Sequence, residues 1–114
     1  MSYLTPRIDL VRNDTGPQLR LSITNELDGS VTDLTGATVT LHFRNPETGV
    51  LLFSRAATIT APNAPLGIAV VQWEAGDLNL TGGAYEGEIE VVLSNGERQT
   101  IYDTLSFRLR EDFA

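Results

Sequence analysis

Three acidic side chains at every second position of one segment are the first residues that could do chemistry: Glu86, Glu88 and Glu90. On a β-strand, residues i and i+2 share a face and lie about 7 Å apart. Such carboxylates could bind a hard cation or form a general acid–base pair if an adjacent strand supplied further ligands. A solvated acidic face, or a patch that contacts a partner protein, needs no such ligands. We therefore predict a surface of that kind here.

His42 is the only imidazole that could act as a general base. It falls on the polar side of an alternating stretch, and a catalytic triad also needs an orienting carboxylate and an exposed nucleophile. The chain has no G-x-S-x-G elbow to supply that nucleophile. It also has no Cys, which excludes thiolate metal sites and Cys nucleophiles. The sequence predicts no enzyme, with no catalytic, metal or cofactor-binding residues.

Two oxygen-rich turns and one tryptophan have structural explanations. The turns lie around Asp28 and Asp33 and around Asp77, and neither matches the spacing of a calcium-binding loop. Asp side chains also cap turns by bonding to nearby backbone groups. Trp73, which alternates with Val71, could form a sugar-stacking platform with the tyrosines. In a small sandwich a single Trp usually fills the core, and we predict that role.

Length and charge restrict the class of protein. A chain of 114 residues fits one domain, spanning 1–114. Its 8 basic and 15 acidic residues give a net charge of −7, which disfavours nucleic acid as a partner. The start of the chain has no secretory signal pattern, and apolar stretches such as 50–53 are far shorter than the roughly 20 residues of a membrane span. We therefore expect synthesis in the host cytoplasm and no membrane partner.

Hydrophobicity alternates with a period of two through most of the chain, which is typical of half-buried antiparallel strands. Turn residues such as Asp-Gly, Asn-Pro and Asn-Gly separate these stretches. The pattern predicts an all-β fold, an immunoglobulin-like antiparallel β-sandwich of about seven strands. The expected strands are 6–13, 18–26, 37–45, 50–60, 67–74, 84–94 and 98–110.

The length of the loop at Asn95-Gly96 decides how the expected strands 84–94 and 98–110 pair. A two-residue loop at Asn95-Gly96 would turn one apolar row toward water, because a shift of one residue exchanges the two faces of a strand. A three-residue loop pairs Val91 with Gln99 or Ile101 and keeps both apolar rows inside. The sequence therefore predicts an odd-length loop with Gly96 at positive φ.

Loop exposure and acidity select the residues expected to contact other proteins. The chain ends, 1–5 and 111–114, are expected as free arms. The predicted contact residues are Asp14, Thr15, Gly16, Pro17, Asn45, Pro46, Glu47, Glu86, Glu88 and Glu90.

Four segments in this order resemble a known family. They read DTGPQL at 14–19, VTDLTGATV at 31–39, GIAVVQW at 67–73 and GGAYEGEIEV at 82–91. Their order and spacing resemble the N-terminal domain family of phage baseplate upper proteins and related small virion proteins. Gln72 stands where the family pattern has an aromatic residue, and the family's Pro-containing segment appears here as Gln99–Tyr102.

The resemblance implies a non-enzymatic structural protein of a bacteriophage virion, a building block of the baseplate, tail or connector. Its partners would be other virion structural proteins, in a homo-oligomer or another symmetric assembly. The sequence continues into none of the fibre-like regions that follow this domain in baseplate proteins. A capsid decoration protein, or a module that binds a carbohydrate or receptor, is the alternative; a metal-dependent hydrolase built on the glutamate row is the least favoured.

Overall fold

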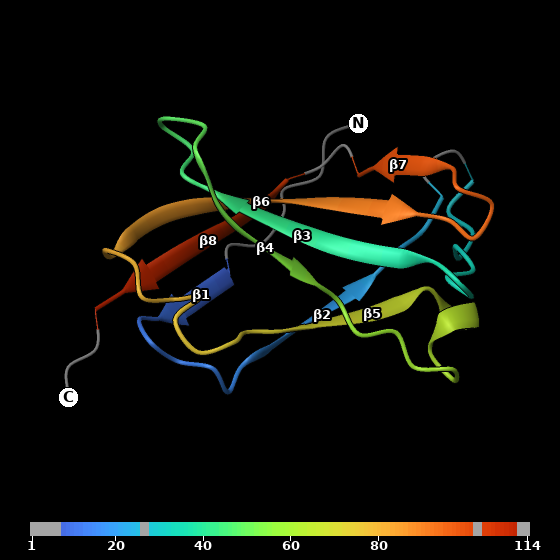
Figure 1. Ribbon diagram of the computed structural model, residues 1–114, viewed down its shortest axis with the longest axis horizontal. Coiled ribbons are helices and arrows are strands. Elements are labelled where there is room, and N and C mark those ends of the chain that lie inside the picture. The colour runs from blue at the N-terminus through green and yellow to red at the C-terminus, as the bar shows by residue number, and fades with distance from the viewer. Residues whose placement is uncertain (1–7, 26–27, 102–103, 112–114) are drawn as a thin grey trace.

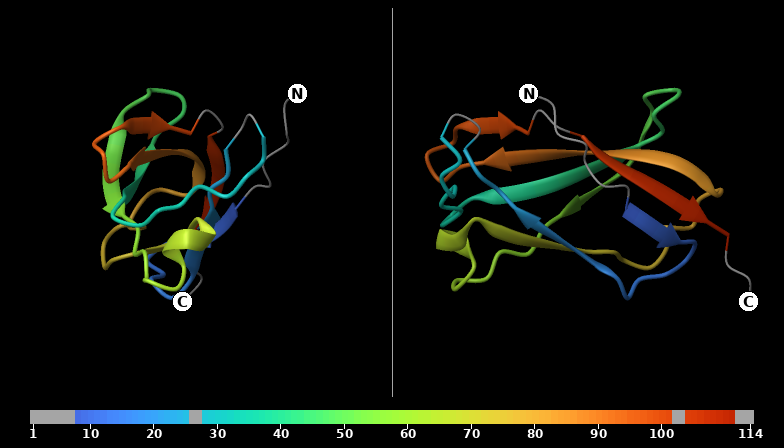
Figure 2. Two further views of the ribbon diagram at one scale, coloured as in Figure 1. Left: turned by 90° about the vertical axis from the view of Figure 1, so that its right-hand side faces the viewer. Right: turned by 180° about the vertical axis from the view of Figure 1, so that it is seen from behind.

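The computed structural model describes residues 8–25, 28–101 and 104–111. Its strands form two sheets that pack face to face (Figures 1 and 2). The larger sheet has the order β1-β8-β6-β3-β4, with β7 also paired to β6, and the smaller sheet contains β2 and β5. The elements are β1 (Ile8–Val11), β2 (Gln18–Ser22), β3 (Thr38–Arg44), β4 (Leu51–Ala56), the 3-10 helix η1 (Ala64–Leu66), β5 (Ile68–Gln72), β6 (Gly83–Val92), β7 (Arg98–Thr100) and β8 (Leu105–Arg110). The predicted all-β sandwich is confirmed.

One pairing and one strand differ from the sequence-based expectation. β1 pairs with β8 in parallel, whereas every other pair of named strands is antiparallel. The predicted strand 98–110 is divided into β7 and β8, because the register against β6 shifts by two residues between them. Gly87 pairs with Leu105, so an unbroken register would place residue 102 opposite Glu90, but Glu90 pairs with Thr100. Residues 102 and 103 lie outside the described part of the chain.

The hairpin between β6 and β7 has the predicted odd-length loop. Leu93 donates its N–H to the Glu97 carbonyl at 2.8 Å, which leaves three residues, 94–96, in the loop. Gly96 has φ +88°, and Val91 pairs with Gln99. Glycine adopts this left-handed conformation without a Cβ clash, and both apolar rows therefore face the core.

The core lies between the two sheets and is built around aromatic rings. Phe43 stacks on Phe53 with ring centroids 4.8 Å apart and meets the edge of Trp73 at 6.1 Å. Trp73 is only 2% exposed, which confirms its predicted role in the core. Aliphatic side chains from both sheets and from the segments that connect the strands surround these rings: Leu10, Leu21, Ile23, Leu34, Val39, Leu41, Val71, Leu78, Ile89, Val91 and Leu109.

Candidate functional site

The sandwich is closed along one long side and open along the other. On the closed side, the chain that leaves β4 meets β5, where Thr58 donates to the Val70 carbonyl at 2.7 Å and Val70 donates back at 3.0 Å. On the open side, β2 pairs only with β5 among the strands of the described residues. Within residues 8–25, 28–101 and 104–111, no strand pairs with the second edge of β2, which lies beside the gap between the two sheets.

Free backbone groups line this edge of β2. Ile23 donates its N–H to the Gly67 carbonyl at 2.8 Å and so points toward the β5 side. In an antiparallel ladder, successive residues direct their N–H and C=O groups to opposite sides. The groups of Arg20, Ser22 and Thr24 therefore point to the open edge, and the side chains of these three residues are exposed.

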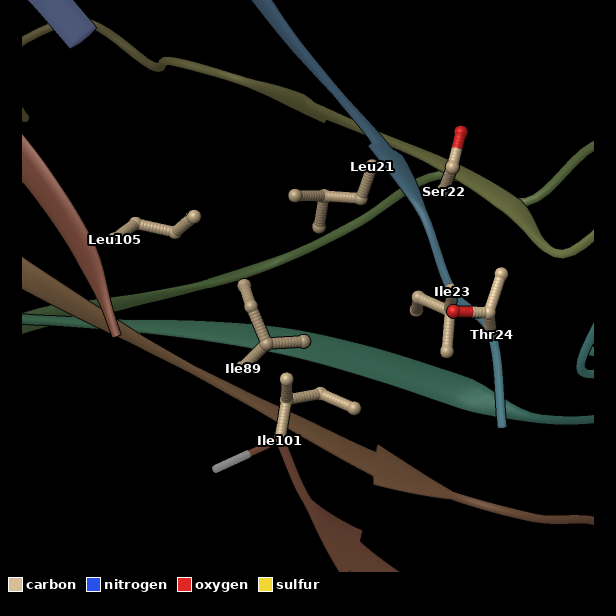
Figure 3. A pocket seen from close by; sticks show the side chains of 7 residues that line it. All are labelled: Leu21, Ser22, Ile23, Thr24, Ile89, Ile101 and Leu105. Atoms are coloured by element: carbon tan, nitrogen blue, oxygen red, sulfur yellow. The ribbon is translucent and has the colours of Figure 1, made fainter. Parts of the chain in front are cut away.

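An apolar cavity of about 230 Å³ lies directly inside this edge. Figure 3 shows Leu21 and Ile23 of the β2 segment facing Ile89, Ile101 and Leu105 across the gap. Ser22 and Thr24 complete its lining. The wall opposite β2 therefore comes from β6 and from the residues at the break between β7 and β8.

A second hollow continues the cavity along the sandwich. It has a volume of about 530 Å³ and shares Thr24 and Ile101 with the first. Its other lining residues are Asn25, Ser30, Val31, Thr32, Leu93, Gln99 and Thr100. The two hollows form one groove, and none of the described residues that line it carries a charge.

The volume of the inner cavity indicates what it can hold. Sites for whole small-molecule ligands usually measure about 300–1,000 Å³, and an apolar cavity of about 150 Å³ accommodates one benzene ring. The cavity beside β2 therefore has room for one or two aliphatic side chains. An extended peptide segment could deliver such side chains while its backbone pairs with β2.

The predicted glutamate row lies on the outer face of the larger sheet, on β6, where it alternates with inward-facing residues such as Ile89. Arg44 of β3 donates from Nε to Glu86 at 2.7 Å, and Arg98 of β7 approaches Glu90 at 3.8 Å. All three glutamates are half-buried, and these basic side chains compensate part of the charge of Glu86 and Glu90. In residues 8–25, 28–101 and 104–111, no three His, Asp or Glu side chains form a group that could hold a metal ion.

His42 has a neighbour across the sheet that the sequence alone does not reveal. Its Nδ1 lies 2.7 Å from the hydroxyl of Ser54, directly across the β3–β4 pair. Its Nε2 lies 3.9 Å from Glu90, which is too far for a hydrogen bond. A serine beside an imidazole resembles part of a catalytic triad, but the carboxylate does not orient this ring. The contact is a cross-strand hydrogen bond on the outer face of the sheet.

The structure does not bring the predicted contact loops together. Asp14, Thr15, Gly16 and Pro17 are exposed between β1 and β2, where Gln72 donates to the Thr15 carbonyl. The other loop forms the tip of the hairpin between β3 and β4, which projects from the sandwich (Figure 1). There Asn45 accepts from the Glu47 N–H at 2.9 Å, and both Pro46 and Glu47 are exposed. Of the expected free arms, residues 1–5 and 112–114 lie outside the described part of the chain.

The oxygen-rich turns contain the capping bonds that the sequence suggested. Asp28 accepts from the N–H and hydroxyl of Ser30, and Asp33 accepts from those of Thr35. These bonds lower the pKa of both carboxyl groups. Asp77 instead is buried and accepts from Arg55, so its role is also structural.

Comparison with solved structures identifies a similar fold. The crystal structure of CopC from Methylosinus trichosporium OB3b superposes with a TM-score of 0.52 over 92% of this chain and 84% of CopC, at 13% sequence identity. At that identity the likeness shows a shared fold, and we transfer no ligand from CopC. No protein-family model matches the sequence, and a search of curated proteins finds no significant match. No helix in the described ranges has the length and apolarity to cross a membrane.

This comparison corrects the expected function. The motif order suggested a building block of a phage virion, with capsid decoration or carbohydrate binding as alternatives. The match to CopC points away from a structural role in a virion, and that expectation is therefore wrong. The aromatic platform expected for carbohydrate binding also loses its main residue, because Trp73 is buried.

Proposed function

We propose that this chain is a non-enzymatic protein-binding module that accepts an extended segment of a partner protein along the free edge of β2. The observation that supports this proposal is the juxtaposition of an unpaired strand edge with an apolar cavity. Arg20, Ser22 and Thr24 offer backbone donors and acceptors at the edge, and Leu21 and Ile23 face the cavity. An added strand would satisfy the backbone groups and fill the cavity at the same time.

The geometry also specifies the partner's sequence pattern. Side chains alternate between the two faces of a strand, so every second residue of the bound segment would enter the cavity. The cavity beside Ile89, Ile101 and Leu105 accepts aliphatic side chains, because an unpaired polar group would be costly there. The uncharged lining of the outer hollow favours Ser, Thr or Gln at the positions that follow.

A library of displayed twelve-residue peptides, selected on the purified protein, tests the proposal. We expect enriched peptides to carry aliphatic residues at positions i and i+2. The variant Ser22→Pro removes an edge N–H that points away from β5, so it should fold normally and lose peptide binding by at least about tenfold. The matched control Ser22→Ala retains that N–H and should bind like the wild type. Peptides without the alternating pattern, or equal binding by Ser22→Pro, would contradict the proposal.

Hydrogen exchange supplies an independent measurement. A selected peptide should slow exchange of the amides of Arg20, Ser22 and Thr24, because these become hydrogen-bonded only in the complex. The amides of Leu21 and Ile23 face β5 in both states and should change little. Protection spread equally over both sets would indicate general stabilisation instead of strand addition.

A further inference from the structure

The strands of the smaller sheet carry a single charge, and that charge lies at the open edge. β2 reads QLRLS and β5 reads IAVVQ, so neither strand contains an acidic residue. Arg20 is their only charged side chain, and it is exposed. Val70 lies directly opposite it on β5, and the amide of the neighbouring Gln18 donates to Gln72 at 2.9 Å. The surface beside the edge is therefore locally basic, although the whole chain is acidic.

Arg20 also differs from most other arginines that the structure describes. Four of these contact a carboxylate: Arg12, Arg44, Arg55 and Arg98. Among the described residues, Arg20 has no side-chain partner of this kind. Its guanidinium group therefore keeps all of its donors available, and a partner's carboxylate could bind it without breaking an existing ion pair.

The register of β2 places this charge next to the cavity. The backbone groups of Arg20 point to the open edge, and the following residue, Leu21, lines the cavity. A segment residue that pairs with Arg20 across the edge would have its side chain on the same outer face as the guanidinium group. The Cβ atoms of such a pair lie about 4.5–5.5 Å apart, so an acidic side chain there is within reach.

We propose that the partner segment carries Asp or Glu beside its aliphatic pair, at the position that pairs with Arg20. This inference rests on the proposed function and adds the charge of the partner to it. The order along β2 sets the order along the segment: the aliphatic side chains enter beside Leu21 and Ile23, and the uncharged positions lie in the outer hollow beyond Thr24. The acidic residue therefore flanks the aliphatic pair on the side away from that hollow, whichever way the segment runs.

The net charge of −7 does not remove this preference. At physiological ionic strength, interactions between exposed charges are screened over about 8 Å. Neither β2 nor β5 supplies a carboxylate that would compete for Arg20. Carboxylates elsewhere on the chain would repel an acidic peptide wherever its charge lies. A gain in affinity is therefore expected at one position of the segment only.

Substitution of that position in a selected peptide tests the inference. Replacing the acidic residue by Gln should weaken binding to the wild type about two- to fivefold, and Lys should weaken it further. With Arg20→Glu the order should invert, so that the Lys peptide binds best. Arg108→Glu is the matched control, because Arg108 is also exposed and lies on the outer face of the other sheet. It changes the net charge by the same amount and should keep the wild-type order. Circular dichroism would verify that both variants fold.

The results separate this inference from the proposed function. Selected peptides with alternating aliphatic residues but no acidic preference at this position would overturn the acidic partner alone. An affinity order that Arg20→Glu leaves unchanged, or that Arg108→Glu inverts equally, would do the same. Peptides without the aliphatic alternation, or equal binding by Ser22→Pro, would overturn both proposals.

Discussion

Replacing Asp77 by Asn is expected to destabilise the protein, because this residue joins three parts of the chain. Asp77 is 8% exposed and accepts from Arg55 through Nε at 2.9 Å and through a terminal nitrogen at 2.5 Å. It also accepts the N–H of Glu74 at 2.8 Å. Hydrogen bonding to Asp77 raises the pKa of Arg55 above its usual value. Asn has nearly the same shape but cannot compensate the guanidinium charge.

The expected loss lies below that of a fully buried pair. Breaking a buried ion pair by removing one partner costs about 3–5 kcal/mol. The Arg55 side chain is 23% exposed and still contacts Glu74 at 2.9 Å, so water and that carboxylate compensate part of its charge. We therefore expect Asp77→Asn to lower the free energy of unfolding by about 2–3 kcal/mol. With an unfolding entropy of about 2.1 cal/mol/K per residue, the melting temperature should fall by roughly 10 °C.

Urea unfolding followed by Trp73 fluorescence measures this loss, because the indole is buried in the folded state. Glu74→Gln is the control: the Glu74 side chain is 67% exposed, and its removal should cost no more than about 0.5 kcal/mol. A double-mutant cycle with Arg55→Gln should give a coupling energy of at least about 1 kcal/mol. A loss below about 0.5 kcal/mol for Asp77→Asn would show that the pair does not stabilise the fold.

Three further changes test the packing and the turns. Gly87→Ala should cost about 1–3 kcal/mol in urea unfolding, because its Cβ would lie 2.8 Å from Phe107 Cε2. Gly67→Ala should cost at least about 2 kcal/mol in the same assay, since φ is +71° and the Cβ would lie 2.7 Å from the Ile23 carbonyl oxygen. Turn bonds lower the pKa of Asp33 from its usual 3.8, so the stability they give is present above that pH and is lost as the pH falls through the folded-state pKa. Carboxyl NMR titration should give a value below 3.8, and a value at or above it would contradict the turn bonds.

Local sequence signals predicted the strands and one hairpin well. Alternation fixes which side chains face the core, and Gly96 fixes the loop between β6 and β7. Trp73 was placed in the core by the same reasoning. The parallel pairing of β1 with β8 depends on contacts between the two ends of the chain, and no local pattern encodes it.

The candidate sites depend on long-range register and could not be read from the sequence. Ser54 meets His42, and Arg55 meets Asp77, only because particular strands and loops become neighbours. The cavity beside β2 arises where β7 and β8 are out of register, at Ile101 and Leu105. The apolar character of these residues was evident, but the sequence did not show that β2 would lack a second neighbour.

The motifs that resemble the phage family explain why the resemblance implied the right fold and the wrong function. In the segment 31–39, Asp33 caps a turn through Thr35, and Gly36 adopts φ +72°. In the segment 82–91, Gly87 allows Phe107 to pack closely. These residues satisfy requirements of a sandwich, which proteins of unrelated function can share.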